Sequence, residues 1–182
     1  MYGIDLLVEE HQNIISFTEY IRKLCCGILD GEEVPIDIFH ECVDFGRNYA
    51  DKHHHGKEEK ILFCIMQEQL GTVAEKLIRG GMLVEHDLGR YHMRELKNAL
   101  QQYEEEATTL NKLSIITHAS GYADLLKRHI EKEDEVAYAF ADRMLSQEAK
   151  RQVDEETREF EEEAMKQGIQ RKYLDWLKNL SK

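Results

Sequence analysis

The stretch "DKHHHGKEEKILF", residues 51–63, places three consecutive histidines just ahead of two glutamates. Such a run either forms a solvated polar face of a helix or supplies ligands to a metal. Neighbouring residues of an α-helix point about 100° apart, so the three imidazoles are not expected to face the same way. The middle one, His54, continues an apolar stripe, and Glu58 follows it by one helical turn. We therefore expect His54 and Glu58 to face the interior.

The two flanking histidines receive a different prediction. His53 and His55 are expected to leave the stripe and to lie in solvated positions or behind the ligands. His55 and Glu59 also have the four-residue spacing of a ligand pair. Choosing that pair would turn Gly46, Ala50 and Ile61 away from the core, so it is rejected in favour of His54 and Glu58, and His55 stays only as the alternative.

The composition predicts an all-α protein. The chain of 182 residues contains one proline, and 33% of its residues are charged. Apolar spacing of three and four predicts four long helices that form an up-down-up-down bundle over residues 1–145. Residues 146–182 are expected to add helices, broken at Gly168, that pack on or beside the bundle. The predicted bundle helices span 5–29, 35–70, 82–105 and 111–145.

Charge and hydropathy exclude several classes of function. The formal net charge of −12 argues against nucleic-acid binding, which needs clustered Lys and Arg. No run approaches the roughly 20 apolar residues of a membrane span, and no signal-peptide pattern opens the chain. A cytoplasmic protein without a membrane partner is expected. The acidic stretch "DEETREFEEEA" is predicted to be a solvated helix face, and the four cysteines contain no CxxC pair and are expected to stay reduced.

One histidine interrupts the apolar stripe of each predicted bundle helix. A lone histidine in such a stripe is more often a hydrogen-bonded core residue than a ligand. Here, however, the first two are 43 residues apart and so are the last two, which places each pair at matching depth in an antiparallel pair of helices. The four residues are His11, His54, His86 and His129.

Two carboxylates accompany these histidines. Glu58 follows His54 by four residues, and Glu133 follows His129 by four. Buried carboxylates are normally paired or bound to metal, because an unpaired buried charge is very costly. Four imidazoles and two carboxylates suit iron, and a carboxylate can bridge two metal ions, although another transition metal would fit as well. The competing interpretation is a metal-free bundle with a hydrogen-bonded polar core.

Four segments, "VEEHQNI", "HHHGKEEKILF", "MLVEHDLGRY" and "LLKRHIEKEDEVAYAF", resemble the hemerythrin-like family, in its bacterial HHE cation-binding branch. The resemblance implies a non-haem di-iron centre with carboxylate bridges and an oxo or hydroxo bridge. An open position on one iron would take dioxygen, nitric oxide or peroxide. Carried over residue by residue, it implies a set of six ligands: His11, His54, Glu58, His86, His129 and Glu133.

The chain departs from the oxygen-carrying hemerythrins at two positions. Those carriers have a second histidine one turn after the first on the third helix, where this chain has Arg90. They also use an aspartate five residues after the histidine of the fourth helix, where Asp134 follows the preferred Glu133. Arg90 either leaves one metal more open or pairs with a bridging carboxylate. Tyr122, on the stripe two turns before His129, is expected to be a core aromatic residue rather than a redox tyrosine.

The resemblance therefore implies a protein that binds or senses dioxygen, nitric oxide, peroxide or iron itself. The alternative is a di-iron enzyme of oxidative or nitrosative defence that reduces peroxide or nitric oxide, or repairs iron centres. The sequence has no rubredoxin-like cysteine cluster and no flavin or haem motif, which favours binding or sensing. The C-terminal helices are expected to cover the bundle or to bind a protein partner or a second copy of the chain.

Overall fold

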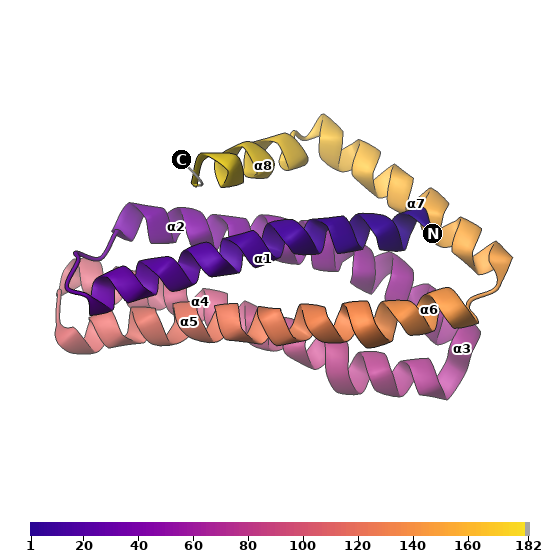
Figure 1. The fold of residues 1–182 in the computed structure, drawn as a ribbon, viewed down its shortest axis with the longest axis horizontal. Coiled ribbons are helices and arrows are strands. Elements are labelled where there is room, and N and C mark those ends of the chain that lie inside the picture. Colours follow the sequence, from indigo (N-terminus) through magenta and orange to yellow (C-terminus); the bar gives the residue numbers. More distant parts are fainter. Residues whose placement is uncertain (181–182) are drawn as a thin grey trace.

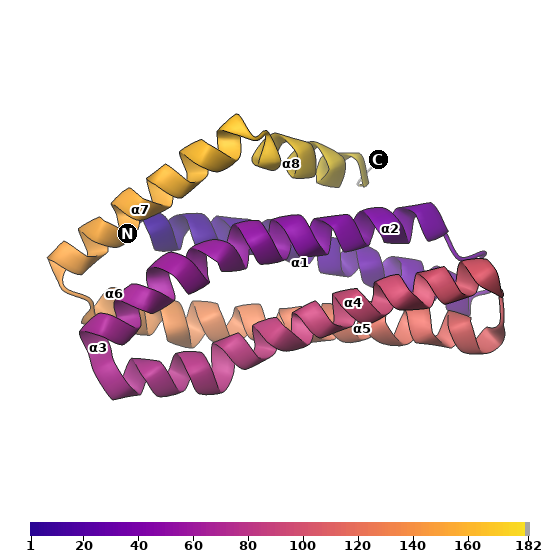
Figure 2. The same ribbon diagram turned by 180° about the vertical axis from the view of Figure 1, so that it is seen from behind.

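The computed structural model describes residues 1–180, and these are almost entirely helical. Four long helical segments run antiparallel with short connections, which confirms the predicted up-down-up-down bundle (Figures 1 and 2). The first segment is α1 (Tyr2–Leu29), and the second consists of α2 (Ile36–Phe45), η1 (Gly46–His55), η2 (Glu58–Leu62) and α3 (Phe63–Leu77), where η marks a π-helical segment. The third consists of η3 (Ile78–Met82) and α4 (Leu83–Glu105), and the fourth of α5 (Thr109–Lys132), η4 (Glu133–Tyr138) and α6 (Ala139–Met144).

Glycines and a capping hydroxyl, both recognisable in the sequence, mark the ends of these helices. Gly31 follows α1 with a φ of +101°, a left-handed conformation that glycine adopts without steric cost. The Thr108 hydroxyl caps α5 by accepting from the backbone N–H of Asn111 at 3.2 Å. Gly71, predicted to stop the second helix, has a φ of +61° and kinks the chain inside α3.

The π-helical segments are the feature that a regular α-helical pattern does not anticipate. In a π-helix the backbone bonds run from i to i+5, so each turn holds more residues and the side chains rotate out of the α-helical phase. The segments η1, η2 and η4 contain or adjoin the histidines and glutamates of the sequence pattern at positions 54, 58, 129 and 133. Short π-helical insertions of this kind are frequent at functional sites.

Two apolar clusters fill the bundle, one toward each end. The first contains Ile14, Ala50 and Leu126, and the second contains Leu7, Ile61 and Ala137. The histidines and glutamates lie between these positions on every helix, so a polar layer separates the two clusters. A polar layer in the middle of a bundle must be internally satisfied or hold a ligand, because unpaired buried polar groups are costly.

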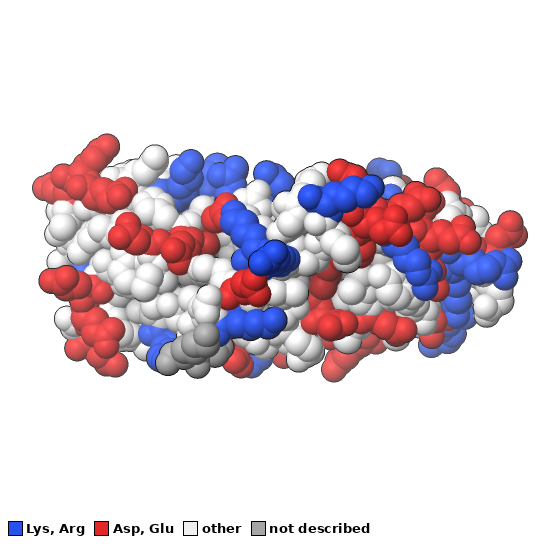
Figure 3. Space-filling model, turned by 90° about the horizontal axis from the view of Figure 1, so that it is seen from above, with Lys and Arg blue, Asp and Glu red and all other residues white. Residues whose placement is uncertain are grey.

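Two further helices, α7 (Gln147–Lys166) and α8 (Ile169–Leu180), lie across the outside of the bundle (Figure 1). The Ser146 hydroxyl caps α7 by accepting from the Ala149 N–H at 3.1 Å, and Gly168 separates the helices with a φ of +71°. α7 packs on α1, η2 and α3, and α8 packs on α1 and η1. The outer face of α7 carries many Asp and Glu side chains, which crowd the right-hand half of Figure 3.

Among the described helices, none is long and apolar enough to cross a membrane. The four cysteines are all free thiols, with Cys25 and Cys42 buried and Cys26 and Cys64 exposed.

Candidate metal centre

Seven ionisable side chains meet in the polar layer where α1, η1, η2, α4, α5 and η4 come together. Each is exposed to no more than 3%, which is unusual for groups of this chemistry. Five are imidazoles and two are carboxylates: His11, His54, His55, Glu58, His86, His129 and Glu133.

The seven side chains form two groups. The ligand atoms of His55, His86 and His129 all lie within 4.8 Å of one another, and the same limit holds for a second group. That second group consists of His11, His54, Glu58 and Glu133. Each group has the size and the nitrogen and oxygen donors of a transition-metal site.

The two carboxylates connect the groups. Oε2 of Glu133 lies 3.3 Å from Nε2 of His11, whereas its Oε1 lies 3.1 Å from Nε2 of His129. One carboxylate oxygen therefore faces each group. Oε2 of Glu58 lies 3.7 Å from Nε2 of His54 and 3.5 Å from Nε2 of His86. Both glutamates are thus placed to bridge two metal ions.

Six of the inward-facing atoms have no hydrogen-bond partner within the described residues. Eight buried side-chain nitrogen and oxygen atoms lack a partner there, and six of them belong to this centre. Buried polar atoms have a hydrogen-bond partner in the great majority of cases, so six unpartnered atoms that face one another need an explanation. A pair of bound cations would satisfy all of them at once: Nε2 of His54, His86 and His129, Oε2 of Glu58, and both oxygens of Glu133.

A ring of outer carboxylates fixes the direction of every imidazole. Each histidine of the centre places its Nδ1 against a carboxylate, which can only accept, so each Nδ1 donates and Nε2 faces inward. The pairs are His11 with Asp134 at 2.8 Å, His54 with Glu10 at 2.9 Å, His55 with Asp51 at 3.4 Å, His86 with Glu59 at 2.7 Å, and His129 with Glu85 at 3.0 Å.

Burial and neighbouring charges together set the protonation of these groups in the metal-free protein. It lowers the pKa of His54 to about 4 and that of His55 well below its usual range, which keeps both imidazoles neutral. Burial also raises the pKa of Glu58, and the nearby Glu133 carboxylate raises it further. Burial opposes protonation of His11, but its hydrogen bonds to Asp134 and Glu133 outweigh burial and raise its pKa to about 9. A metal ion would displace that proton.

A buried tyrosine completes the inner surface, and the sequence pattern did not reveal it. The Tyr138 hydroxyl donates to Oε1 of Glu58 and lies 3.4 Å from Nε2 of His11, while its ring stacks on that imidazole. Burial raises the pKa of the phenol, so it stays protonated. Tyr138 follows Glu133 by five residues, which is one turn of a π-helix but not of an α-helix.

The solvated positions predicted for the histidines flanking His54 are contradicted. The alternative, a position behind the ligands, holds for His53, whose partner Glu10 also accepts from His54. His53 and His55 are both buried, because η1 is π-helical and adjacent residues there do not follow α-helical phase. The ring of His55 stacks on that of His86, with 3.8 Å between centroids. His53 instead approaches Glu10 and Glu161, but the ammonium of the buried Lys57 contacts all three and fills the space a metal would need.

The remaining predicted residues occupy defined positions. Asp134 accepts from His11, and Glu133 is the acidic residue that faces the histidines. Arg90 pairs with Asp51, Glu59 and Asp87, and not with Glu58 or Glu133. Tyr122 is a buried core aromatic residue, as predicted.

Comparison with known proteins agrees with this geometry. A family model described as the hemerythrin HHE cation-binding domain matches residues 2–141, which include every side chain of the two groups. No curated protein and no solved structure gives a significant match. Since the family match spans most of the chain, the chain belongs to the hemerythrin HHE cation-binding family, whose members bind metal, typically iron.

Proposed function

We propose that the chain holds a non-haem di-iron centre, bridged by Glu58 and Glu133, and that the centre binds or senses dioxygen, nitric oxide or peroxide. The observation that carries this proposal is the set of six buried ligand atoms without partners, all facing one another inside the bundle. When bound, the iron pair would supply open coordination positions and one-electron redox chemistry.

The donor set favours iron among the common metals. Imidazole nitrogen and carboxylate oxygen suit iron, manganese or zinc, whereas thiolate ligands would favour copper or iron–sulfur chemistry. The buried cysteines Cys25 and Cys42 lie in the apolar cluster away from the centre and take no part in it. Two metal positions bridged by carboxylates inside a helical bundle are typical of di-iron proteins.

The two positions differ in a way that suggests where a small ligand binds. One would be held by the three imidazoles of His55, His86 and His129, the other by the two of His11 and His54 together with Glu58 and Glu133. With both glutamates shared between the positions, the second would have four protein ligands against five at the first, which leaves more room for an exogenous one. The Tyr138 hydroxyl lies beside this position and holds a proton within reach of it. Apolar clusters pack on both sides of the centre, which favours small uncharged ligands.

An enzyme of peroxide or nitric oxide reduction is the second candidate, and Tyr138 is the observation that favours it. A protonated phenol at the edge of the centre is placed to give a proton to a reduced ligand. The two functions differ in turnover. A binding protein or sensor shows a reversible spectral change without sustained consumption, whereas an enzyme consumes peroxide or nitric oxide when an electron donor is supplied.

Metal analysis of protein purified without a tag tests the centre. About two iron ions per chain are expected after iron loading, and less than one transition-metal ion per chain would refute the proposal. Glu58→Ala should abolish stable loading, and His55→Ala should lose about one of the two ions. His40→Ala is the matched control, because His40 is an exposed histidine paired with Glu104 far from the centre, and it should load like the wild type.

An anaerobic-versus-aerobic absorption spectrum of the loaded protein then tests the ligand. A change on adding dioxygen or nitric oxide that reverses on removing the gas supports binding or sensing. Continuous loss of peroxide in the presence of a reductant supports the enzyme. No spectral response to any of the three ligands would refute both.

A further inference from the structure

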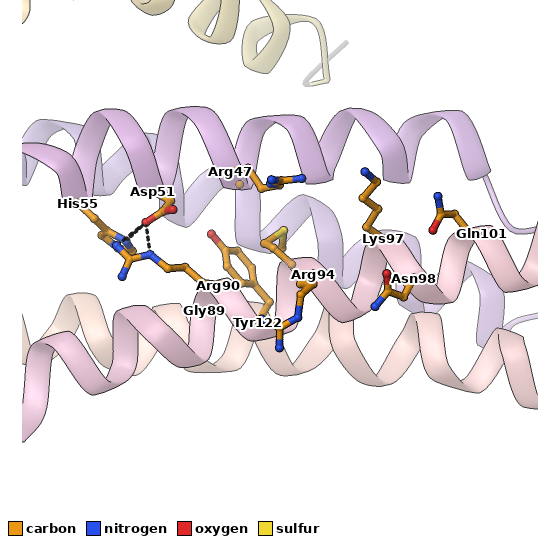
Figure 4. Close-up of a pocket in the computed structure, with 12 residues that line it drawn as sticks. Arg47, Asp51, His55, Gly89, Arg90, Arg94, Lys97, Asn98, Gln101 and Tyr122 are labelled. Atoms are coloured by element: carbon orange, nitrogen blue, oxygen red, sulfur yellow. Dashed lines mark hydrogen bonds and ion pairs between the residues drawn. The ribbon is translucent and has the colours of Figure 1, made fainter.

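A cavity of about 420 Å³ lies between η1 and α4, beside the metal centre (Figure 4). Its inner end reaches His55, one of the clustered histidines, and its apolar side is formed by Met93 and Tyr122. Glycines at positions 46 and 89 line it and keep side chains out of the space. The volume is far larger than dioxygen or nitric oxide requires, so the proposed ligands of the iron pair do not account for it.

The charge of the cavity is opposite to that of the chain. Four of its lining residues are cations and one, Asp51, is an anion, although the whole chain has a formal net charge of −12. Arg47, Arg94 and Lys97 are exposed, so water screens their mutual repulsion, but cations gathered around a hollow create a positive local potential that attracts anions. The cations are Arg47, Arg90, Arg94 and Lys97.

Two of these cations have no internal partner. Arg90 is engaged by three carboxylates, and Arg94 pairs with its chain neighbour Glu95 at 3.0 Å. Arg47 and Lys97 form no ion pair or side-chain hydrogen bond within residues 1–180. They come from facing helices, and Figure 4 shows Lys97 extending from α4 toward the helix that carries Arg47. An oxyanion placed between them would receive charge-assisted hydrogen bonds from both sides.

We propose that this basic cavity binds a small organic oxyanion, either a phosphorylated molecule or a polycarboxylate. Its anionic group lies between Arg47 and Lys97, and its uncharged part covers Met93 and Tyr122. This site is distinct from the iron pair, and its ligand is anionic and of metabolite size. Binding requires no metal, so it is measurable even if the proposed iron centre fails.

The cavity also contacts the hydrogen bonds that orient two imidazoles. Arg90 donates to Asp51 and to Glu59, and these two carboxylates accept from His55 and His86. In Figure 4, Asp51 is joined to both Arg90 and His55. A bound anion that attracts Arg90 would weaken its hold on both carboxylates. If the iron centre forms, occupancy of the cavity should therefore shift its absorption spectrum, a second readout that rests on the proposed function.

Isothermal titration calorimetry of the full chain, with and without iron, tests the proposal. Pyrophosphate and citrate serve as probes, and one equivalent of at least one of them should bind. Arg47→Ala/Lys97→Ala should weaken that binding by at least roughly tenfold, since each lost charge-assisted bond removes a tenfold factor or more. Lys127→Ala/Arg128→Ala, on an exposed face of α5 and with the same charge change, should bind like the wild type.

The two probes distinguish the two classes of oxyanion. Tighter binding of pyrophosphate assigns the cavity to phosphorylated ligands, and tighter binding of citrate assigns it to polycarboxylates. The exchange Arg47→Lys/Lys97→Arg should retain binding, which shows that charge at these positions matters, and thermal unfolding verifies that each variant is folded. The proposal is overturned if neither probe binds at millimolar concentration, if the cavity variant binds normally, or if the α5 control weakens binding equally.

Discussion

Replacing the buried Lys57 should destabilise the protein strongly, and the structure gives the size of the effect. Only 1% of this side chain is exposed. Its ammonium contacts Oε1 of Glu10 on α1 and Oε1 of Glu161 on α7, and lies 3.1 Å from Nε2 of His53. One charge thus joins the first helix, the second helical segment and the C-terminal helix α7.

The expected loss of unfolding free energy for Lys57→Met depends on which hydrogen bonds Glu10 and Glu161 keep. Removing one partner of a buried ion pair typically costs 3–5 kcal/mol, roughly, because the other charge stays buried and unpaired. Glu10 keeps its hydrogen bond from His54, and Glu161 is 14% exposed and keeps a bond from Gln170 at 2.9 Å. Methionine also preserves most of the apolar stem. We therefore expect the lower end of the range, about 3 kcal/mol of unfolding free energy.

Denaturant unfolding of the metal-free protein measures this loss, because bound metal would add its own stabilisation. Lys60→Met is the matched control: Lys60 lies three residues on, is exposed, and should change stability by less than about 0.5 kcal/mol. A double-mutant cycle with Glu161→Gln should show a coupling of roughly 1–3 kcal/mol with Lys57. If Lys57→Met unfolds at the same denaturant concentration as the control, the buried network does not stabilise the fold.

Three further results are expected. Burial raises the pKa of Asp44, but hydrogen bonds from α8 outweigh burial and lower the pKa, so the ionised carboxylate stabilises the packing of α8. This stabilisation is present above about pH 4 and is lost as pH falls through the lowered pKa, so Trp176 fluorescence should report loosening of α8 in acid, and Asp44→Asn should differ from wild type only at higher pH. Tyr138→Phe should lower the unfolding free energy of the metal-free protein by about 1–3 kcal/mol, measured in guanidinium, because a buried carboxylate loses its donor; unchanged stability would contradict that hydrogen bond. Burial raises the pKa of Cys25 to about 11 and that of Cys42 higher still. An aromatic disulfide reagent at pH 8 should therefore modify the exposed Cys26 and Cys64 quickly, and Cys25 and Cys42 only on unfolding; fast modification of all four thiols would contradict the burial of Cys25 and Cys42.

The fold was predictable because its determinants are local. Apolar spacing identifies the helices, and Gly31, Gly71 and Gly168 mark their breaks through positive φ values. Equal separations also predicted that the two stripe histidines of each antiparallel pair of helices would lie at matching depth. The buried lysine was not predictable in the same way, since its partners Glu10 and Glu161 lie on helices distant in sequence, and a lysine among other charged residues reads as exposed.

The orientation of side chains around His54 was not predictable from α-helical phase. The sequence offered two i, i+4 pairs, His54 with Glu58 and His55 with Glu59, and one regular helix can turn only one of them inward. The π-helical segment η1 turns both histidines inward, and Glu59 becomes the acceptor for His86. Hydrogen bonding from i to i+5 is set by tertiary packing and leaves little trace in the spacing of apolar residues.

This geometry also gives a physical reason for the departure at Arg90. One turn after His86, the third helix supplies an arginine where the resemblance would place a second histidine. The structure brings a third imidazole to that group from His55 on the neighbouring helix, stacked directly on His86. Arg90 then holds Asp51 and Glu59, the carboxylates that orient those two imidazoles. A cation in place of a ligand is compatible with a complete donor set, because the adjacent helix changes its hydrogen-bonding pattern and contributes two consecutive histidines instead of one.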